Sequence, residues 1–183
     1  MKVILVAQGR TAWDEEGRLQ GRIDVPLSVR GRKEVTSLAR KLKAFHPKRI
    51  LTGTGQTQLE TAGILERELG CRVRSTAQLN ELDHGLWQGM LLSELEERYP
   101  GFHRRWLKGP QSVSPPRGES IAGLLDRVGA VIDGLRRRPG ARTVVMVLPE
   151  TARLAAHALL TGVGLETVAS PRTSRRQWTE VEI

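Results

Sequence analysis

The residues best placed to carry out chemistry directly follow three short apolar runs. Each run ends in polar or turn-forming residues, at Gln8-Gly9, Thr52-Gly53 and Pro149-Glu150. Ligands of α/β sheets bind just beyond the carboxyl ends of the strands, so we expect a site where these segments meet. A helix that begins at Pro149 carries Glu150 in its first turn. A carboxylate there stabilises the helix and repels the anions that a helix N-terminus attracts.

The histidines and the cysteine do not indicate a metal or redox site. The chain has one cysteine, Cys71, which excludes an internal disulfide and a metal site made of cysteines alone. The histidines, at 46, 84, 103 and 157, have no metal-ligand spacing with one another or with acids. We therefore expect no metal and no cofactor, a packing role for His84, a buried thiol at Cys71 and, by default, a cytoplasmic protein.

The spacing of apolar residues predicts the elements that position the site. Runs at 2–7 and 143–148 are typical of strands buried on both faces, and shorter strands are expected at 49–52 and around Val73. Helices are predicted at 28–45, 59–69, 91–99, 119–138 and 151–161. We expect a polar loop up to Pro26, Pro149 at the first position of the last helix, and short extended pieces from Val168 onward. This alternation predicts a layered α/β fold in one domain, residues 1–183.

Composition excludes several classes of protein. Of 183 residues, 39% are hydrophobic and 27% charged, as in globular proteins, and no apolar run approaches the ~20 residues of a membrane span. The formal net charge is +9, but the basic residues are spread along the chain and aromatic residues make up only 4%. Proteins that bind single-stranded nucleic acid interleave basic with aromatic residues. We therefore expect a generally basic solvated surface and not a nucleic-acid partner.

A series of motifs, in order along nearly the whole chain, resembles the histidine phosphatase superfamily, in its phosphoglycerate mutase-like or alpha-ribazole phosphatase-like branch. The matching residues are Gly9, Thr11, Gly17, Arg18, Gln20, Gly21, Asp24, Pro26, Leu27, Ser28, Gly31, Leu79, Asn80, Glu81, Gly85, Trp87, Gly89, Tyr99, Pro100, 115–120, Arg127 and Val128. The resemblance implies a three-layer α/β/α sandwich with a mostly parallel central sheet.

The resemblance also implies a site in which most of the reactive groups are replaced. Family members phosphorylate a histidine of the first motif, and Gln8 occupies that position here. The arginine before it is Ala7, a second arginine falls on Thr57, and a second histidine falls on Pro149. The proton-donating carboxylate is retained as Glu81.

Each replacement removes a function that phosphoryl transfer requires. A neutral imidazole nitrogen has a lone pair that can attack phosphorus, whereas the amide nitrogen of Gln8 has its lone pair delocalised into the carbonyl. Ala7 and Thr57 lack the guanidinium fork that matches phosphate oxygens, and a charge-assisted contact contributes ~1.5–3 kcal/mol. Pro149 supplies neither a side-chain donor nor a backbone N–H.

These replacements favour a catalytically inactive member of the family that acts as a binding or regulatory module. The alternative is a phosphatase for a small phosphomonoester with an altered mechanism, in which Glu81 is the general acid or base. We predict ligand contacts at Arg10, Thr11, Gln20 and Gly21. The expected partner is a protein or a small anionic ligand, and a homodimer is left open.

Overall fold

The computed structural model describes residues 1–108, 114–137, 142–164 and 177–183, and its five strands form one sheet in the order β3-β2-β4-β1-β5. The strands are β1 (Lys2–Ala7), β2 (Arg49–Thr52), β3 (Arg72–Ser75), β4 (Thr143–Leu148) and β5 (Trp178–Glu182). The β1–β4, β2–β4 and β2–β3 pairs are parallel, and β5 alone runs antiparallel, along β1. This confirms the predicted, mostly parallel sheet.

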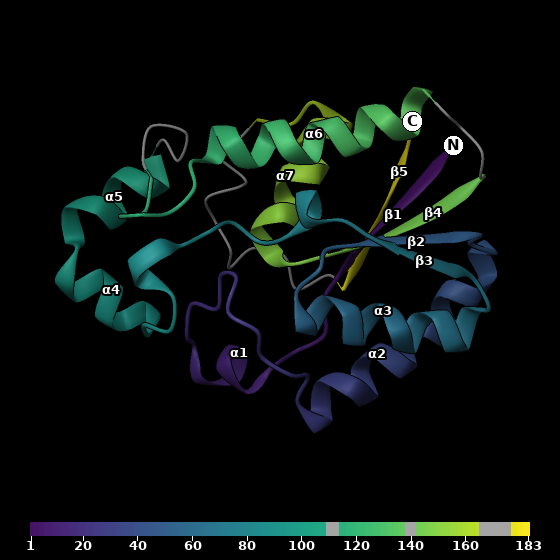
Figure 1. The fold of residues 1–183 in the computed structure, drawn as a ribbon, viewed down its shortest axis with the longest axis horizontal. Helices are drawn as coiled ribbons and strands as arrows, with labels where there is room; N and C mark the ends of the chain where they lie inside the picture. Colours follow the sequence, from purple (N-terminus) through teal and green to yellow (C-terminus); the bar gives the residue numbers. More distant parts are fainter. Residues whose placement is uncertain (109–113, 138–141, 165–176) are drawn as a thin grey trace.

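Helices cover both faces of the sheet, as a three-layer sandwich requires (Figure 1). One face carries α2 (Val29–Leu42) and α3 (Gln56–Leu69), and the other carries α6 (Ile121–Arg137) and α7 (Glu150–Thr161). Alternate side chains of β1 enter the two cores: Val3 and Leu5 pack with α6 and α7, whereas Ile4 and Val6 pack with α2 and α3. A strand that is apolar at every position is thereby buried on both sides.

The ends of the predicted helices follow the local chemistry of the sequence. Ser28 caps α2, because its hydroxyl accepts a hydrogen bond from the Gly31 N–H at 3.0 Å. Gly70 ends α3 in the left-handed conformation, with φ 65°. The prediction for Pro149 was wrong by one position. It is the extended N-cap residue of α7, and Glu150 is the first helical residue.

Two short helices are absent from the prediction. The expected polar loop contains α1 (Ala12–Glu16), which Thr11 opens: its hydroxyl accepts from the Asp14 N–H while the Asp14 carboxylate accepts from the Thr11 N–H. The predicted helix at 91–99 is α4 (Leu92–Arg98), and α5 (Pro100–Lys108) follows it. A five-residue helix is too short to display an apolar period, so only the cap residues could reveal α1.

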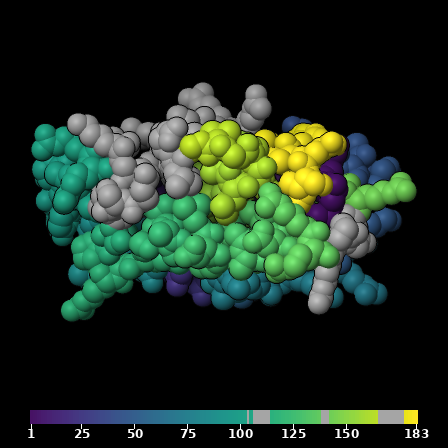
Figure 2. All heavy atoms as spheres, turned by 90° about the horizontal axis from the view of Figure 1, so that it is seen from above, coloured from purple at the N-terminus to yellow at the C-terminus, as the bar shows by residue number. Residues whose placement is uncertain are grey.

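The two ends of the chain lie side by side in the sheet. Because β5 is antiparallel to β1, Lys2 pairs with Glu182, and the N-terminal residues lie against the C-terminal ones in the space-filling view (Figure 2). The extended pieces predicted between 168 and 176 lie outside the described residues. Within the described part of the chain, no helix has the length and apolarity needed to cross a membrane. Cys71 is a free, buried thiol, as predicted.

Candidate functional site

The carboxyl ends of the central strands bring the four predicted site positions together. Gln8 follows β1 and Pro149 follows β4, and these parallel neighbours are joined where the Gln8 N–H donates to the Leu148 carbonyl at 2.9 Å. Thr57 lies in the first turn of α3, the helix that follows β2. Strand β2 pairs with β4 along the edge of β4 that faces away from β1. All three residues line one cavity of about 30 Å³ together with Glu81. By the usual relation of cavity size to water occupancy, this space holds about two water molecules.

The predicted ligand contacts separate into two groups. Gln20 and Gly21 line the cavity, and so does Arg22. Arg10 and Thr11 do not: Arg10 forms an exposed ion pair with Glu34 at 3.4 Å, and Thr11 is fully buried as the cap of α1. The Arg10 side chain is thus paired with α2, and that of Thr11 supports the start of α1.

Glu81 caps the helix that follows β4. Its Oε2 accepts a hydrogen bond from the Thr151 N–H in the first turn of α7 at 3.0 Å, and its Oε1 accepts from the Leu82 N–H at 2.7 Å. Pro149, the N-cap residue itself, supplies no side-chain cap. Burial raises the pKa of the Glu81 carboxyl above its ordinary value, against the two N–H groups, which lower it. The carboxyl therefore has a structural task at the helix end besides any chemical one.

Thr57 fixes the orientation of the Gln20 side chain. The Thr57 hydroxyl donates to the Val25 carbonyl at 2.6 Å, so its oxygen is left to accept from Gln20 Nε2 at 2.9 Å. Gln20 Nε2 also donates to the Ile23 carbonyl at 3.0 Å. Both amide hydrogens are then used, and Gln20 Oε1 is a buried acceptor with no donor among the described residues.

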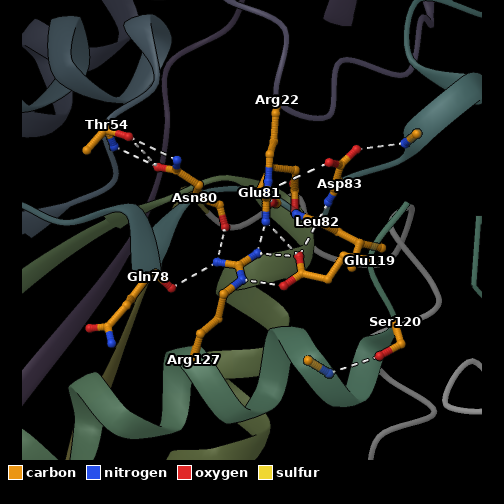
Figure 3. A network of polar contacts seen from close by, with 12 residues as sticks. Arg22, Thr54, Gln78, Asn80, Glu81, Leu82, Asp83, Glu119, Ser120 and Arg127 are labelled. Carbon is orange, nitrogen blue, oxygen red and sulfur yellow. Dashed lines mark hydrogen bonds and ion pairs between the residues drawn. The ribbon is translucent and has the colours of Figure 1, made fainter. Parts of the chain in front are cut away.

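A network centred on Arg127 holds the backbone behind Glu81 in place (Figure 3). The Arg127 guanidinium projects from α6 and donates to three main-chain carbonyls, those of Gln78, Asn80 and Glu81, at 2.8, 2.7 and 2.9 Å. Its Nε and Nη2 also donate to the two oxygens of Glu119 at 2.7 and 2.8 Å. One side chain thereby ties the segment that carries Glu81 to helix α6.

Arg22 joins this network from the first loop and is committed to it. Its Nη2 donates to Glu119 at 3.0 Å and its Nε to the Glu81 carbonyl at 3.1 Å. Burial by itself would raise the pKa of Glu119, but the hydrogen bonds and charge of Arg127, together with the charge of Arg22, outweigh it and lower that pKa. Glu119 is thus held as a carboxylate that binds both guanidinium groups.

In place of the free first-turn carboxylate that the sequence predicts at Glu150, the structure has an ion pair. Arg153, one helical turn later and only 2% exposed, reaches both Glu150 oxygens with Nη2 at 3.0 Å. Burial raises the pKa of Glu150 against the effect of Arg153, and the charge of Asp14 raises it further. Glu150 does not line the cavity, so its effect on an anion there is weaker than expected.

His84 is 7% exposed, as a packing residue should be. Burial lowers its pKa from 6.5 to about 4, against the charges of Asp83 and Glu119, which raise it. Among the described residues, no cluster of three or more His, Cys, Asp or Glu side chains could hold a metal ion.

The lowered pKa of His84 predicts a loss of stability in acid. As the pH falls from 6.5 towards 4, the unfolded chain gains a proton on this residue and the folded chain does not. Folding is therefore weakened by about 3 kcal/mol over that interval, at 1.36 kcal/mol per pH unit. Urea unfolding of the natural chain and of His84→Gln across this pH range measures the effect as a difference between the two.

The difference in unfolding free energy between the natural chain and His84→Gln also cancels the contributions of other titrating groups. Glu81 and Glu150, whose pKa values are raised, act in the opposite sense, since stability falls as the pH rises above their ordinary values. Both groups are present in the natural chain and in the variant. A difference in unfolding free energy that stays constant with pH would contradict the assignment to His84.

Some residues of the site have no role assigned by the sequence. Arg127 and Glu119 match the family pattern, which marks them as candidates, yet their local spacing does not reveal that they brace Glu81. Arg18, which also matches the family pattern, braces the first loop, because its Nη1 donates to the Gly89 carbonyl at 3.0 Å.

Comparison with known proteins identifies the class that this fold and site belong to. The chain matches the model of the histidine phosphatase superfamily (branch 1) over residues 3–183, and it belongs to that superfamily. Phosphoserine phosphatase 1 of Hydrogenobacter thermophilus is 34% identical over 165 residues, which cover 90% of this chain and 78% of that protein.

Solved structures agree on the fold. YhfR of Bacillus stearothermophilus superimposes with a TM-score of 0.87 at 27% identity, covering all of this chain and 91% of its own. A mycobacterial glucosyl-3-phosphoglycerate phosphatase, solved with VO3, gives a TM-score of 0.88 at 24% identity over 98% of this chain and 90% of its own. The family resemblance seen in the sequence is confirmed, and two of these three similar proteins are named as phosphatases.

Proposed function

We propose that this chain is a single-domain member of the family that binds a ligand or a partner without phosphoryl transfer. The observation that carries the proposal is the convergence of Gln8, Thr57 and Pro149 on one cavity with Glu81. None of the described residues that line this cavity is a histidine, and its one guanidinium, Arg22, is paired with Glu119. A pocket of this composition lacks both a nucleophile and a free cation for a phosphate.

The position of Glu81 supports the same conclusion. Its oxygens accept the N–H groups of Leu82 and Thr151, so the one retained acid acts as the cap of α7. Loss of a helix cap costs about 0.5–2 kcal/mol. Retention of Glu81 is thus accounted for by stability and does not require catalysis. Cytoplasmic location and a homodimer remain predictions.

A second function, a phosphatase with an altered mechanism, is favoured by one observation. Glu81 is a carboxyl whose pKa is raised by burial at the wall of the cavity. A carboxyl with a raised pKa is suited to protonate a leaving group or, once ionised, to activate a water. In this case Arg22, on the same wall, is the group that meets the phosphate.

Turnover of p-nitrophenyl phosphate and of phosphoglycerate separates the two functions. For a binding module we expect no hydrolysis above the buffer rate and no acid-labile phosphohistidine after incubation with substrate. Hydrolysis that survives repurification and disappears in Glu81→Gln, with circular dichroism unchanged, would overturn the first proposal in favour of the second. Glu94→Gln, at an acid outside the cavity, is the control for a general effect of losing a carboxylate.

A further inference from the structure

We propose that a basic patch at the amino ends of the parallel strands binds the phosphate backbone of double-stranded nucleic acid, without reading its sequence. This strand-start patch consists of Lys48, Arg49, Arg72, Arg74 and Arg142. The cavity lies at the carboxyl ends of the strands, so the patch is at the opposite edge of the sheet. The inference therefore goes beyond the proposed function and does not depend on what the cavity binds.

Parallel strand pairing brings together basic residues that are far apart in the sequence. Strands β2 and β3 begin at Arg49 and Arg72, which lie directly opposite each other in the sheet. Arg142 immediately precedes β4, and the Lys48 N–H donates to the carbonyl of Thr143, the first residue of β4, at 3.2 Å. In Figure 1 the strands β1, β2 and β4 begin on the right, whereas α4 and α5 lie on the left. Basic residues that are spread along the sequence are thus clustered in the folded chain, which removes one reason for expecting no nucleic-acid partner.

Three arginines of the patch project from one face of the sheet. Residues directly opposite each other on parallel strands point to the same face, as do residues two positions apart on one strand, so Arg49, Arg72 and Arg74 share a face. Neighbouring strands are ~4.8 Å apart and two residues of a strand span ~6.6 Å, so the three Cα atoms lie within about 8 Å of one another. Arg72 and Arg74 are exposed, and Arg49 is half-buried.

The charges of the patch are not neutralised by the protein itself. Within the described part of the chain, none of its five side chains forms a hydrogen bond or an ion pair. Glu66, an acid beside β3, instead accepts the Val73 N–H at 3.2 Å. Like charges directly opposite each other destabilise a sheet, so an anion bound between Arg49 and Arg72 would relieve their repulsion.

The arginines near the first loop show the opposite arrangement. Each arginine of the first 32 residues forms an ion pair with a glutamate: Arg10, Arg18, Arg22, Arg30 and Arg32. The unpaired charge that is free to attract a polyanion is therefore a property of the strand-start patch and not of every arginine on the surface.

The composition of the patch favours a phosphate backbone over a protein partner. The cores of protein interfaces are poor in charged residues and rich in aromatic ones. Among the described residues, the large hydrophobic side chains that are exposed all lie outside the patch, at Ile23, Val29, Leu59, Leu86, Tyr99 and Val163. Electrostatic contacts alone are sufficient for sequence-independent binding of a duplex, and the planar fork of arginine matches phosphate oxygens. Single strands are held by stacking on aromatic side chains, which the patch lacks.

The size of the patch sets the expected salt dependence. From β3 to β4 the patch crosses two strand spacings, about 10 Å. Each strand of a duplex carries one phosphate per ~3.4 Å of its axis, so the patch can contact about three phosphates. At about −0.9 for each neutralised phosphate, the slope of log K against log salt concentration should be about −3, with a dissociation constant of about 10⁻⁴–10⁻⁶ M.

Fluorescence anisotropy of a labelled duplex of about 20 base pairs, titrated with the full chain between about 50 and 200 mM NaCl, measures the affinity and its salt dependence. We expect equal affinity for two duplexes of unrelated sequence, and weaker binding of a single strand of the same length and of a labelled poly-glutamate. No saturable binding at the lowest salt concentration overturns the inference. Tighter binding of poly-glutamate overturns it in favour of an acidic protein partner, and tighter binding of the single strand overturns the assignment to a duplex.

A triple variant, Arg49→Gln, Arg72→Gln, Arg74→Gln, removes the cations of the shared face. It should weaken binding of the duplex at least tenfold and make the slope of the salt dependence shallower by about 2–3, because about 0.9 is lost with each phosphate contact. Unchanged affinity in this variant, with circular dichroism also unchanged, overturns the inference.

The matched control is Arg98→Gln, Arg104→Gln, Arg105→Gln, which loses the same net charge at three exposed arginines of α4 and α5, at the other end of the molecule (Figure 1). Its affinity for the duplex should stay within about threefold of the natural chain, since these arginines lie outside the proposed contact. Equal weakening in the two triple variants overturns the inference, because net charge alone would then account for binding.

If the patch variant does not fold, a smaller pair of variants decides in the same way. Arg72→Gln with Arg74→Gln, confined to exposed positions of the edge strand β3, is compared with Arg104→Gln with Arg105→Gln. Weaker binding in the first pair alone supports the inference, and equal binding in both overturns it. None of these outcomes involves turnover of a phosphomonoester, which tests the proposed function separately.

Discussion

The quadruple variant Ala7→Arg, Gln8→His, Thr57→Arg, Pro149→His is expected to hydrolyse p-nitrophenyl phosphate at least about 10³-fold faster than the natural chain. Gln8, Thr57 and Pro149 line the cavity, and Ala7 is the last residue of β1, directly before Gln8, so the restored groups lie in the cavity wall or next to it. Loss of the nucleophile from a well-studied serine protease costs about 10⁶ in turnover, which sets the scale of what a new histidine can restore. Steady-state hydrolysis and trapping of an acid-labile phosphohistidine measure the gain.

A triple variant that keeps Gln8 but carries the other three substitutions is the matched control. It restores the phosphate-binding groups without the nucleophile, so it should bind inorganic phosphate more tightly than the natural chain and form no phosphoenzyme. Thr57→Arg also removes the hydroxyl that orients Gln20. If the natural chain hydrolyses the substrate as fast as the quadruple variant, the replaced residues are not what prevents catalysis.

Arg127→Ala is expected to lower the free energy of unfolding by about 3 kcal/mol, as removal of one partner from a buried ion pair does. The side chain is only 15% exposed, and its loss leaves Glu119, 17% exposed, without its principal partner. Three main-chain carbonyls, those of Gln78, Asn80 and Glu81, lose a donor at the same time. Chemical denaturation at neutral pH measures the change.

Arg22→Ala is the matched control, because Arg22 also binds Glu119 but is 39% exposed. Exposed ion pairs contribute about 0–1 kcal/mol, so its loss should have a small effect. Arg127→Lys keeps the charge and loses the planar fork, and we expect an intermediate value. Equal losses in Arg22→Ala and Arg127→Ala would contradict the larger contribution to stability that we assign to Arg127.

The larger elements of this fold could be predicted because each has a period or a run of its own. The strands at 2–7, 49–52 and 143–148 match the structure residue by residue. The missed helices α1 and α5 have weaker local signals: α1 has only its caps, and α5 follows α4 without a break beyond Pro100. Pro149 was misplaced by one position because a proline before a helix fits both the N-cap and the first helical position.

The sequence by itself determined the family, the layered sheet and which reactive residues are replaced, because residue types and their order along the chain are enough for these. Only the tertiary structure decided how the retained residues are used. Glu81 caps α7 by accepting a hydrogen bond from Thr151, which lies 70 positions later in the chain. Thr57 orients the side chain of Gln20, which lies 37 positions earlier. Such contacts depend on how distant segments pack against one sheet. Local propensity and periodicity extend over a few residues only, and so they carry no record of which distant donor meets which acceptor.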